Sequence, residues 1–268
     1  MEANWKKEKT RIVVKVGSST LSFRNGKINL QRIERLAREL SGIKRQGHEV
    51  ILVSSGAIAV GGGLLGLREK PGKLAEKQAL AAVGQAELMK IYQKFFEPEQ
   101  QTVAQVLLTR DGLEEEEKRR NARNTLTRLL EMGIIPIINE NDTVSTFGIR
   151  FGNNDVLAAS VAALMEADLL VILSDINGLY TADPRRDPSA RIIERVDELS
   201  PEILRTAGGS GNSFGTGGMS VKLDAARITM EAGIDMIIAN GEDPAILGRI
   251  LSGTPAGTLF AGKKPEKN

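Results

Sequence analysis

Short apolar segments rich in β-branched residues alternate along this chain with longer amphipathic segments. The apolar segments predict strands at Arg11–Val16, Glu49–Ser54, Thr102–Leu108, Ile134–Asn139, Leu169–Ser174 and Asp235–Ala239. The amphipathic segments predict helices at Asn29–Gln46, Leu74–Phe96, Glu115–Met132, Asp155–Glu166 and Ser220–Ala232. Near-continuous apolar strands separated by helices are typical of a parallel sheet covered on both faces. We therefore expect an α/β fold, a three-layer αβα sandwich with a mostly parallel, open sheet.

No linker rich in proline, glycine or serine divides the 268 residues of the chain. A hydrophobic content of 41% is enough to build a substantial core, so disorder is not the default expectation. We expect one domain over residues 1–262, followed by a disordered tail over residues 263–268.

Composition excludes several classes of partner and site. The 36 Lys and Arg residues face 34 Asp and Glu, and this net charge of +2 gives no reason to expect nucleic acid. Cysteine is absent and His48 is the only histidine, so thiolate and histidine metal clusters are excluded and we assign no metal ligand. The polar N-terminus lacks the apolar core of a signal peptide, and no apolar run approaches the ~20 residues that span a bilayer. We expect a cytoplasmic protein that contacts no membrane.

Polar residues stand where four of the predicted strands end. Lys15 lies inside an apolar strand, where burial of its ammonium group is costly unless an anion meets it. The other three strands lead into Ser54-Ser55-Gly56-Ala57, Asn139-Glu140-Asn141-Asp142 and Ser174-Asp175. Any one of these endings is compatible with ordinary turn chemistry. Because ligands of open parallel sheets bind outside the carboxyl ends of the strands, the four endings together predict one crevice at this edge.

The run from Gly208 to Lys222 is rich in glycine and leads into a predicted helix, for which Ser220 is a good N-cap. The unpaired backbone N–H groups of a helix N-terminus favour an anion. A cation in the first turn, such as Lys222, opposes the helix dipole by roughly 0.3–1 kcal/mol at an exposed site. This misfit suggests a negative group nearby, with phosphate as the first candidate. The alternative is an ordinary surface loop with a chance lysine.

Several familiar motifs are absent or misplaced. The chain has no P-loop sequence and no G-x-S-x-G motif of a serine hydrolase. The segment Gly61–Gly66 satisfies G-x-G-x-x-G, but it follows no strand directly and leads toward Pro71, so we do not assign it to a dinucleotide. Two lysines, glycine-rich turns and several carboxylates remain. This inventory suits phosphoryl transfer, which depends mostly on positioning and charge neutralisation.

Six further motifs stand out: Val13–Ser19, Val53–Ala59, Asn139–Asp142, Gly152–Asp155, Gly178–Pro184 and Gly215–Lys222. Together they resemble the motifs of the amino acid kinase family, and the resemblance extends from Arg11 to Phe260. Those at Ser55–Ala59, Asn139–Asp142 and Thr216–Ser220 are most similar to the members that phosphorylate L-glutamate. Many of those members carry a C-terminal PUA domain, and we expect this chain to be the kinase domain without it.

The resemblance implies transfer of the γ-phosphoryl group of ATP to the γ-carboxylate of L-glutamate, the first step of proline biosynthesis. It implies catalytic roles for Lys15, Lys222 and Asp155, and glutamate binding by Ser55, Asp142 and Asn154. The nucleotide-binding residues that it implies are Lys15, Ser174, Asp175, Thr216, Gly217, Gly218, Met219, Ser220, Val221 and Lys222. The glycine-rich segment Gly208–Phe214 is then expected to close over the nucleotide.

Other expectations follow from the same resemblance. Mg²⁺ is expected to arrive with ATP, and family members commonly form homo-oligomers and are inhibited by proline. Two alternatives stay open. The chain could be a family member that acts on aspartate, N-acetylglutamate or UMP, or it could be a non-catalytic ligand sensor on the same fold.

Overall fold

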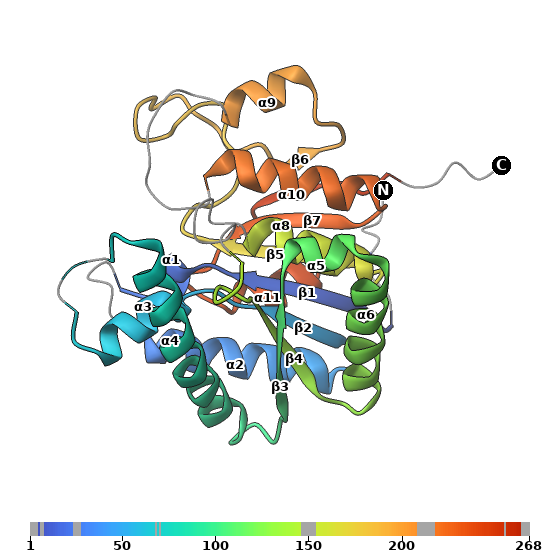
Figure 1. The fold of residues 1–268 in the computed structure, drawn as a ribbon. Coiled ribbons are helices and arrows are strands. Elements are labelled where there is room, and N and C mark those ends of the chain that lie inside the picture. The colour runs from blue at the N-terminus through green and yellow to red at the C-terminus, as the bar shows by residue number, and fades with distance from the viewer. Residues whose placement is uncertain are drawn as a thin grey trace.

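The computed structural model describes residues 5, 8–23, 28–67, 69, 71–145, 154–207, 218–254 and 256–263 (Figure 1). Its centre is an eight-stranded sheet in the order β3-β4-β2-β1-β5-β7-β8-β6. The strands are β1 (Arg11–Val16), β2 (Glu49–Val53), β3 (Val103–Leu108), β4 (Ile135–Glu140), β5 (Leu169–Ser174), β6 (Arg195–Val196), β7 (Asp235–Asn240) and β8 (Thr258–Phe260). Neighbouring strands run parallel except β7 and β8, which are antiparallel.

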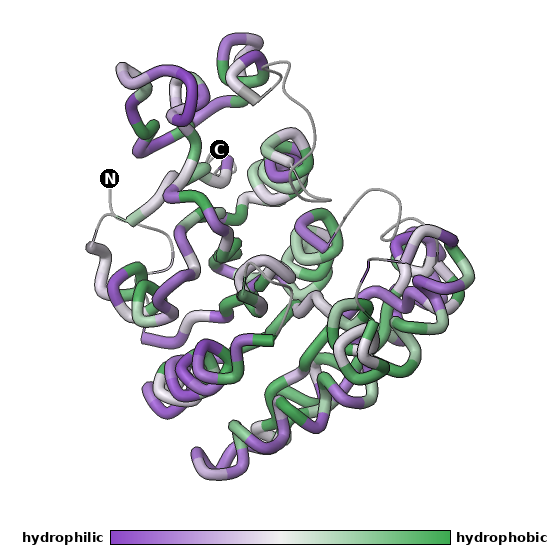
Figure 2. The backbone as a smooth tube through the Cα atoms, turned by 90° about the vertical axis from the view of Figure 1, so that its left-hand side faces the viewer, coloured by the Kyte–Doolittle hydropathy of each residue, from purple (hydrophilic) through white to green (hydrophobic). Residues whose placement is uncertain are grey.

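Helices cover both faces of this sheet. The described helices are α1 (Ser18–Leu21), α2 (Leu30–Arg45), α3 (Ala57–Leu64), α4 (Leu74–Phe96), α5 (Arg110–Glu114), α6 (Glu116–Glu131), α8 (Asn154–Leu164), α9 (Pro201–Ala207), α10 (Met219–Glu231) and α11 (Ile246–Leu251). Ile12 and Val14 of β1 pack in a core with α2, α4 and α11, whereas Val13 packs in a second core with α6, α8 and α10. Figure 2 shows hydrophobic and hydrophilic residues alternating along the helices, as is typical of elements with one buried face. The expected three-layer αβα sandwich is confirmed.

The order of the strands places a change of direction beside β1. The chain moves from β1 to β2 on one side, and later crosses from β4 to β5 on the other side of β1. In open α/β sheets this is where a crevice forms at the carboxyl ends of the strands. Lys15, near the end of β1, pairs in register with Val53 of β2 and Ile172 of β5. It therefore lies beside the point where ligands of such sheets bind.

The sequence-based prediction located the long elements and missed the short ones. The strands at Arg11–Val16 and Leu169–Ser174 and the helix at Leu74–Phe96 match, and the other predicted elements shift by one or two residues at their ends. The strands β6 and β8 and the helices α1, α3, α5, α9 and α11 were not predicted, because such short segments carry too little periodicity. None of the described helices is long and apolar enough to cross a membrane.

The glycine motif Gly61–Gly66 overlaps the end of α3, and packing explains two glycines of this region. A Cβ atom at Gly61 would lie 2.1 Å from the carbonyl oxygen of Leu80 in α4. A Cβ atom at Gly84 of α4 would lie 1.8 Å from the carbonyl oxygen of Ala57 in α3. The two helices therefore approach so closely that only glycine fits at their crossing. Since α3 begins immediately after Ser55 and Gly56, this crossing positions the end of β2.

We expect Gly61→Ala to lower the free energy of unfolding by about 1–3 kcal/mol, because its methyl group would overlap backbone atoms of α4. Gly63→Ala is the matched control on the same helix, since a Cβ atom at Gly63 would meet no described atom within 4 Å. The control should be neutral or stabilising by up to about 1 kcal/mol, because alanine favours a helix interior over glycine. Urea denaturation measures both, and equal stability of the two variants would contradict the packing.

Candidate active site

Three charged side chains meet in the interior beside the sheet. Lys15 comes from β1, Asp155 from the first turn of α8 and Lys222 from the first turn of α10. Oδ1 of Asp155 lies 2.6 Å from Nζ of Lys15, and Oδ2 lies 3.0 Å from Nζ of Lys222. Their exposed fractions are 7% for Lys15, 0% for Asp155 and 6% for Lys222. One carboxylate therefore holds two lysines from separate elements, and α8 and α10 lie side by side to allow it (Figure 1).

The environment changes how readily these groups carry charge. Burial lowers the pKa of Lys15, and the nearby charge of Lys222 lowers it further, while the Asp155 carboxylate opposes both effects. Burial alone would raise the pKa of Asp155, but the two ammonium groups outweigh it and hold this pKa below its ordinary value. When all three groups are ionised, they carry a net charge of +1. A buried group of this charge favours an anion beside it.

Gly17 leaves space beside the ammonium group of Lys15 because it has no side chain. A Cβ atom at Gly17 would lie 3.4 Å from Nζ of Lys15, so the absence of a side chain keeps this side of the ammonium group clear. Asp175, which follows β5, is also close enough for its charge to raise the pKa of Lys15. Ser174 donates a hydrogen bond from Oγ to Oδ1 of Asp175 at 3.1 Å. Two predicted nucleotide-binding residues thus lie at the same edge as Lys15.

The helix α10 begins one residue earlier than predicted. Its N-cap is Gly218, which makes no side-chain cap, and Ser220 lies inside the first turn, so the expectation that Ser220 is the N-cap is wrong. Gly218 and Ser220 are exposed, whereas Met219 and Val221 are partly buried. The predicted residues Thr216 and Gly217, and the segment Gly208–Phe214 expected to close over nucleotide, lie outside the described residues. Lys222 still falls in the first turn, where the local backbone disfavours a cation.

A network of amide and hydroxyl groups surrounds Asn154, the neighbour of Asp155. Its Nδ2 donates to the carbonyl oxygen of Ser54 at 2.6 Å, to Oγ of Ser55 at 2.9 Å and to Oδ1 of Asn139 at 2.9 Å. Ser55 and Asn154, predicted separately from the sequence, are therefore in direct contact. The contacts join the ends of β2 and β4 to the start of α8, directly beside the charged group.

Asp142 lies just beyond β4, at the same edge of the sheet but outside the hydrogen bonds that join Ser55 and Asn154. Burial, together with the negative charge of Glu140, raises its pKa to about 6. Glu140 is itself 4% exposed, and burial raises its pKa as well. Asp142 and Glu140 line a small cavity with Gln85 and Ala81 of α4. Two carboxylates in a partly closed space favour a positively charged group.

Three residues of this region were not assigned from the sequence. Asn139 is 2% exposed and donates from Nδ2 to Oε1 of Gln85 at 2.9 Å. Tyr92 is fully buried and shares a 2.8 Å hydrogen bond with Oγ of Ser54. Asn139 stands inside the motif Asn139–Asp142, so its position offered a signal. Gln85 and Tyr92 lie within α4. The helical pattern of the sequence does not show which polar side chains of a helix contact the end of a strand.

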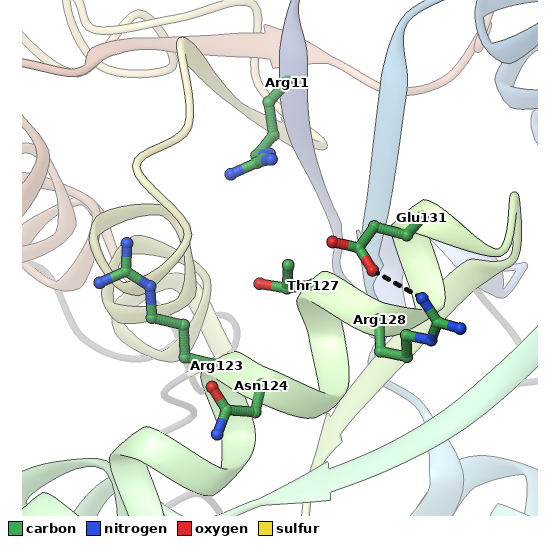
Figure 3. A pocket seen from close by; sticks show the side chains of 6 residues that line it. All are labelled: Arg11, Arg123, Asn124, Thr127, Arg128 and Glu131. Carbon is green, nitrogen blue, oxygen red and sulfur yellow. Dashed lines mark hydrogen bonds and ion pairs between the residues drawn. The ribbon is translucent and has the colours of Figure 1, made fainter.

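A pocket of about 460 Å³ lies elsewhere, near the amino end of β1 (Figure 3). It is lined by Arg11, Arg123, Asn124, Thr127, Arg128 and Glu131. Each of its three arginines forms an ion pair with a carboxylate. The pairs are Arg11–Glu49 at 2.7 Å, Arg128–Glu131 at 3.0 Å and Arg123–Glu166. This pocket is open and remote from Lys15, so the carboxyl edge of the sheet remains the candidate site.

Comparisons with known proteins show which family this chain belongs to. The model of the amino acid kinase family matches residues 10–240. Glutamate 5-kinase of Clostridium perfringens (strain 13 / Type A) is 54% identical over 264 residues, which are 97% of this chain and 98% of that protein. Glutamate 5-kinase of Carboxydothermus hydrogenoformans is 54% identical over 258 residues, which are 96% of this chain and 69% of that longer protein.

Solved structures show the same fold at lower identity. Isopentenyl phosphate kinase of T. acidophilum has a TM-score of 0.62 at 18% identity, covering 93% of this chain and 99% of its own. UMP kinase from Bacillus anthracis has a TM-score of 0.62 at 18% identity, covering 95% of this chain and 97% of its own. By the family match and by its identity to curated relatives, the chain belongs to the glutamate 5-kinase branch of the amino acid kinase family.

Proposed function

We propose that this chain transfers the γ-phosphoryl group of ATP to the γ-carboxylate of L-glutamate, giving L-glutamyl 5-phosphate and ADP in the first step of proline biosynthesis. The observation that carries the proposal is the buried carboxylate of Asp155 between the ammonium groups of Lys15 and Lys222. Two cations fixed by one carboxylate suit a phosphoryl group in transfer. The curated relatives named glutamate 5-kinase support glutamate as the acceptor.

In the proposed reaction a γ-carboxylate oxygen of glutamate attacks the γ-phosphorus of ATP. The bond from this phosphorus to the bridging oxygen breaks, and its electron pair leaves with ADP. Charge on the transferring oxygens would be stabilised by Lys15 and Lys222, and Asp155 would hold both lysines in place rather than act as a base. The γ-carboxylate is already ionised at neutral pH, so no general base is needed. Catalysis then depends on positioning and electrostatics.

Glutamate would bind beside this group. We assign its negative groups to the hydroxyl of Ser55 and nearby backbone donors, and its ammonium group to the carboxylate of Asp142. Asn154 would act with Ser55, since the two side chains are 2.9 Å apart and lie next to Asp155. A free ammonium group is required by this arrangement, which disfavours an N-acetylated acceptor.

The nucleotide would lie along the same edge. Ser174 and Asp175 and the start of α10 at Gly218–Lys222 are its proposed contacts, together with Thr216 and Gly217 outside the described residues. Mg²⁺ would be carried with ATP. In the parts of the chain that the structure describes, no three His, Cys, Asp or Glu side chains are grouped to hold a metal ion. Mg²⁺ that is bound to a nucleotide is commonly held mainly by phosphate oxygens and water.

An acceptor panel tests the function. ADP release is measured with L-glutamate, L-aspartate, N-acetyl-L-glutamate and UMP at equal concentrations, with ATP and Mg²⁺ in excess. We expect L-glutamate to give the highest kcat/KM. Preference for any other acceptor would contradict the proposed substrate, and release of ADP with none of the four would favour the sensor alternative.

The raised pKa of Asp142 predicts a pH dependence. Its carboxylate must be ionised to accept the substrate ammonium group, so kcat/KM for glutamate should fall by up to tenfold per pH unit below about 6. The γ-carboxyl group of glutamate itself titrates near pH 4.3, well below this range. Asp142→Asn should raise the KM for glutamate and remove the inflection near pH 6. An unchanged inflection in that variant would assign it to another group.

Three further properties belong to the same proposal. We propose that proline inhibits the enzyme, that the chain associates with copies of itself and that it works in the cytoplasm. Glutamate saturation curves with and without proline test the first. Light scattering during size-exclusion chromatography tests the second, and cell fractionation tests the third. Saturation curves that coincide at all proline concentrations would contradict inhibition by proline. A monomeric mass would contradict self-association.

A further inference from the structure

Four side-chain amides form a series of hydrogen bonds between the candidate site and β3, the outermost strand on one side of the sheet. Asn154 Nδ2 donates to Asn139 Oδ1 at 2.9 Å, Asn139 Nδ2 donates to Gln85 Oε1 at 2.9 Å, and Gln85 Nε2 donates to Gln105 Oε1 at 3.2 Å. The amides come from α8, β4, α4 and β3 respectively. Each amide nitrogen donates to the oxygen of the next amide, so all the hydrogen bonds of the series point from Asn154 toward Gln105.

Two backbone groups determine that direction. The backbone N–H of Glu140 donates to Oδ1 of Asn139 at 2.9 Å, so this side of the Asn139 amide must be the oxygen. The carbonyl oxygen of Ser54 can only accept, so the group of Asn154 that lies 2.6 Å from it must be the nitrogen. The orientations of both amides are therefore set by hydrogen-bond chemistry.

Gln85 completes the arrangement. With Oδ1 of Asn139 occupied by Asn154 and Glu140, Nδ2 of this buried side chain needs an acceptor, and Oε1 of Gln85 supplies it. Without that acceptor, Asn139 would bury a polar group at a cost or rotate its amide. A rotated Asn139 would present Nδ2 to Nδ2 of Asn154, and two donors cannot bond.

We propose that Gln85 is a positioning residue for the acceptor substrate: its oxygen orients Asn139, and Asn139 in turn orients Asn154 beside Ser55. The inference rests on the proposed function, because it assumes that Asn154 and Ser55 bind glutamate. The side-chain hydrogen bonds of Gln85 go to Asn139 and Gln105 rather than to the lysines or Asp155. Its loss should therefore weaken glutamate binding and leave ATP binding and the chemical step unchanged.

Gln85→Met tests this with a side chain of similar length that lacks the acceptor oxygen. We expect the KM for glutamate to rise about tenfold, with the KM for ATP and kcat within about twofold of the parent enzyme. Gln105→Met is the control, because it removes the partner of the Gln85 nitrogen and leaves the contact with Asn139.

Gln85→Asn gives a second test should the methionine variant fail to fold, since its shorter amide falls short of Asn139 and should show the same rise in KM. Glutamate binding by isothermal titration calorimetry should weaken in parallel. A glutamate KM at the parent value in both variants would overturn the inference while leaving the proposed function intact. A similar rise in the KM for glutamate and in the KM for ATP, together with a fall in kcat, would overturn it too, because it would show a general structural role. A parent enzyme that does not phosphorylate glutamate would instead refute the proposed function.

Discussion

Lys15→Ala and Lys222→Ala should each lower kcat by at least about 10²-fold, if the two ammonium groups stabilise charge on the transferring phosphoryl group. Both side chains are buried and both contact Asp155, at 2.6 Å and 3.0 Å. Electrostatic stabilisation in such a water-poor site is stronger than at a surface. Single-turnover rates with saturating ATP and glutamate measure the chemical step separately from product release.

The control is Lys118→Ala, which removes an ammonium group that is 62% exposed and pairs with Glu115 on the surface. Its kcat should match the parent enzyme. Loss of a single lysine also leaves Asp155 with one cation, so we expect these two variants to stay folded, as thermal denaturation can show. A decrease of less than about threefold for either buried lysine would contradict its assigned role.

Each of the two lysines could be singled out from sequence because each contradicts its local setting. Lys15 interrupts an apolar strand, and Lys222 stands in the first turn of a helix, where the dipole disfavours it. Local rules of this kind cannot say that the two residues meet, since 207 positions separate them in the chain. Their meeting depends on Asp155, and only the resemblance to the family motif pointed to that residue.

The common location of these polar residues was predictable, because it follows from how parallel strands end. Four strand endings with polar residues implied one edge, and the structure places Lys15, Ser55, Asn139 and Ser174 along it. The helix α3 was not predictable in the same way, because glycine is unfavourable in a helix interior and its run at Gly61–Gly63 gives no helical pattern. Glycine is needed in α3 because α4 packs closely against it. This contact joins separate segments of the chain, so the local sequence does not predict it. The same holds for Gln85, whose partner is set by tertiary structure alone.

Asp155→Asn should have the largest effect on stability of any single substitution in the site. The carboxylate is fully buried and contacts both ammonium groups, so its neutralisation leaves two positive charges facing each other in the interior. Removing one partner from a buried ion pair typically costs about 3–5 kcal/mol of unfolding free energy. Urea denaturation at pH 7 measures this loss. Asp224→Asn, on the exposed face of α10, removes a surface carboxylate 3.7 Å from Arg227 and should cost less than about 1 kcal/mol.

The pH dependence of this loss separates electrostatics from a packing defect. In the parent protein the pKa of Asp155 is lowered on folding, so its contribution is present above the unfolded pKa and is lost as the pH falls through the folded pKa. In Asp155→Asn that acid-side loss should disappear. The pKa of Lys15 is already lowered in the fold, and without the carboxylate it should fall further, so the folded variant releases this proton before the unfolded chain does. Stability of the variant should consequently recover relative to the parent as the pH rises from 7 toward 10, whereas a packing defect would leave the difference constant.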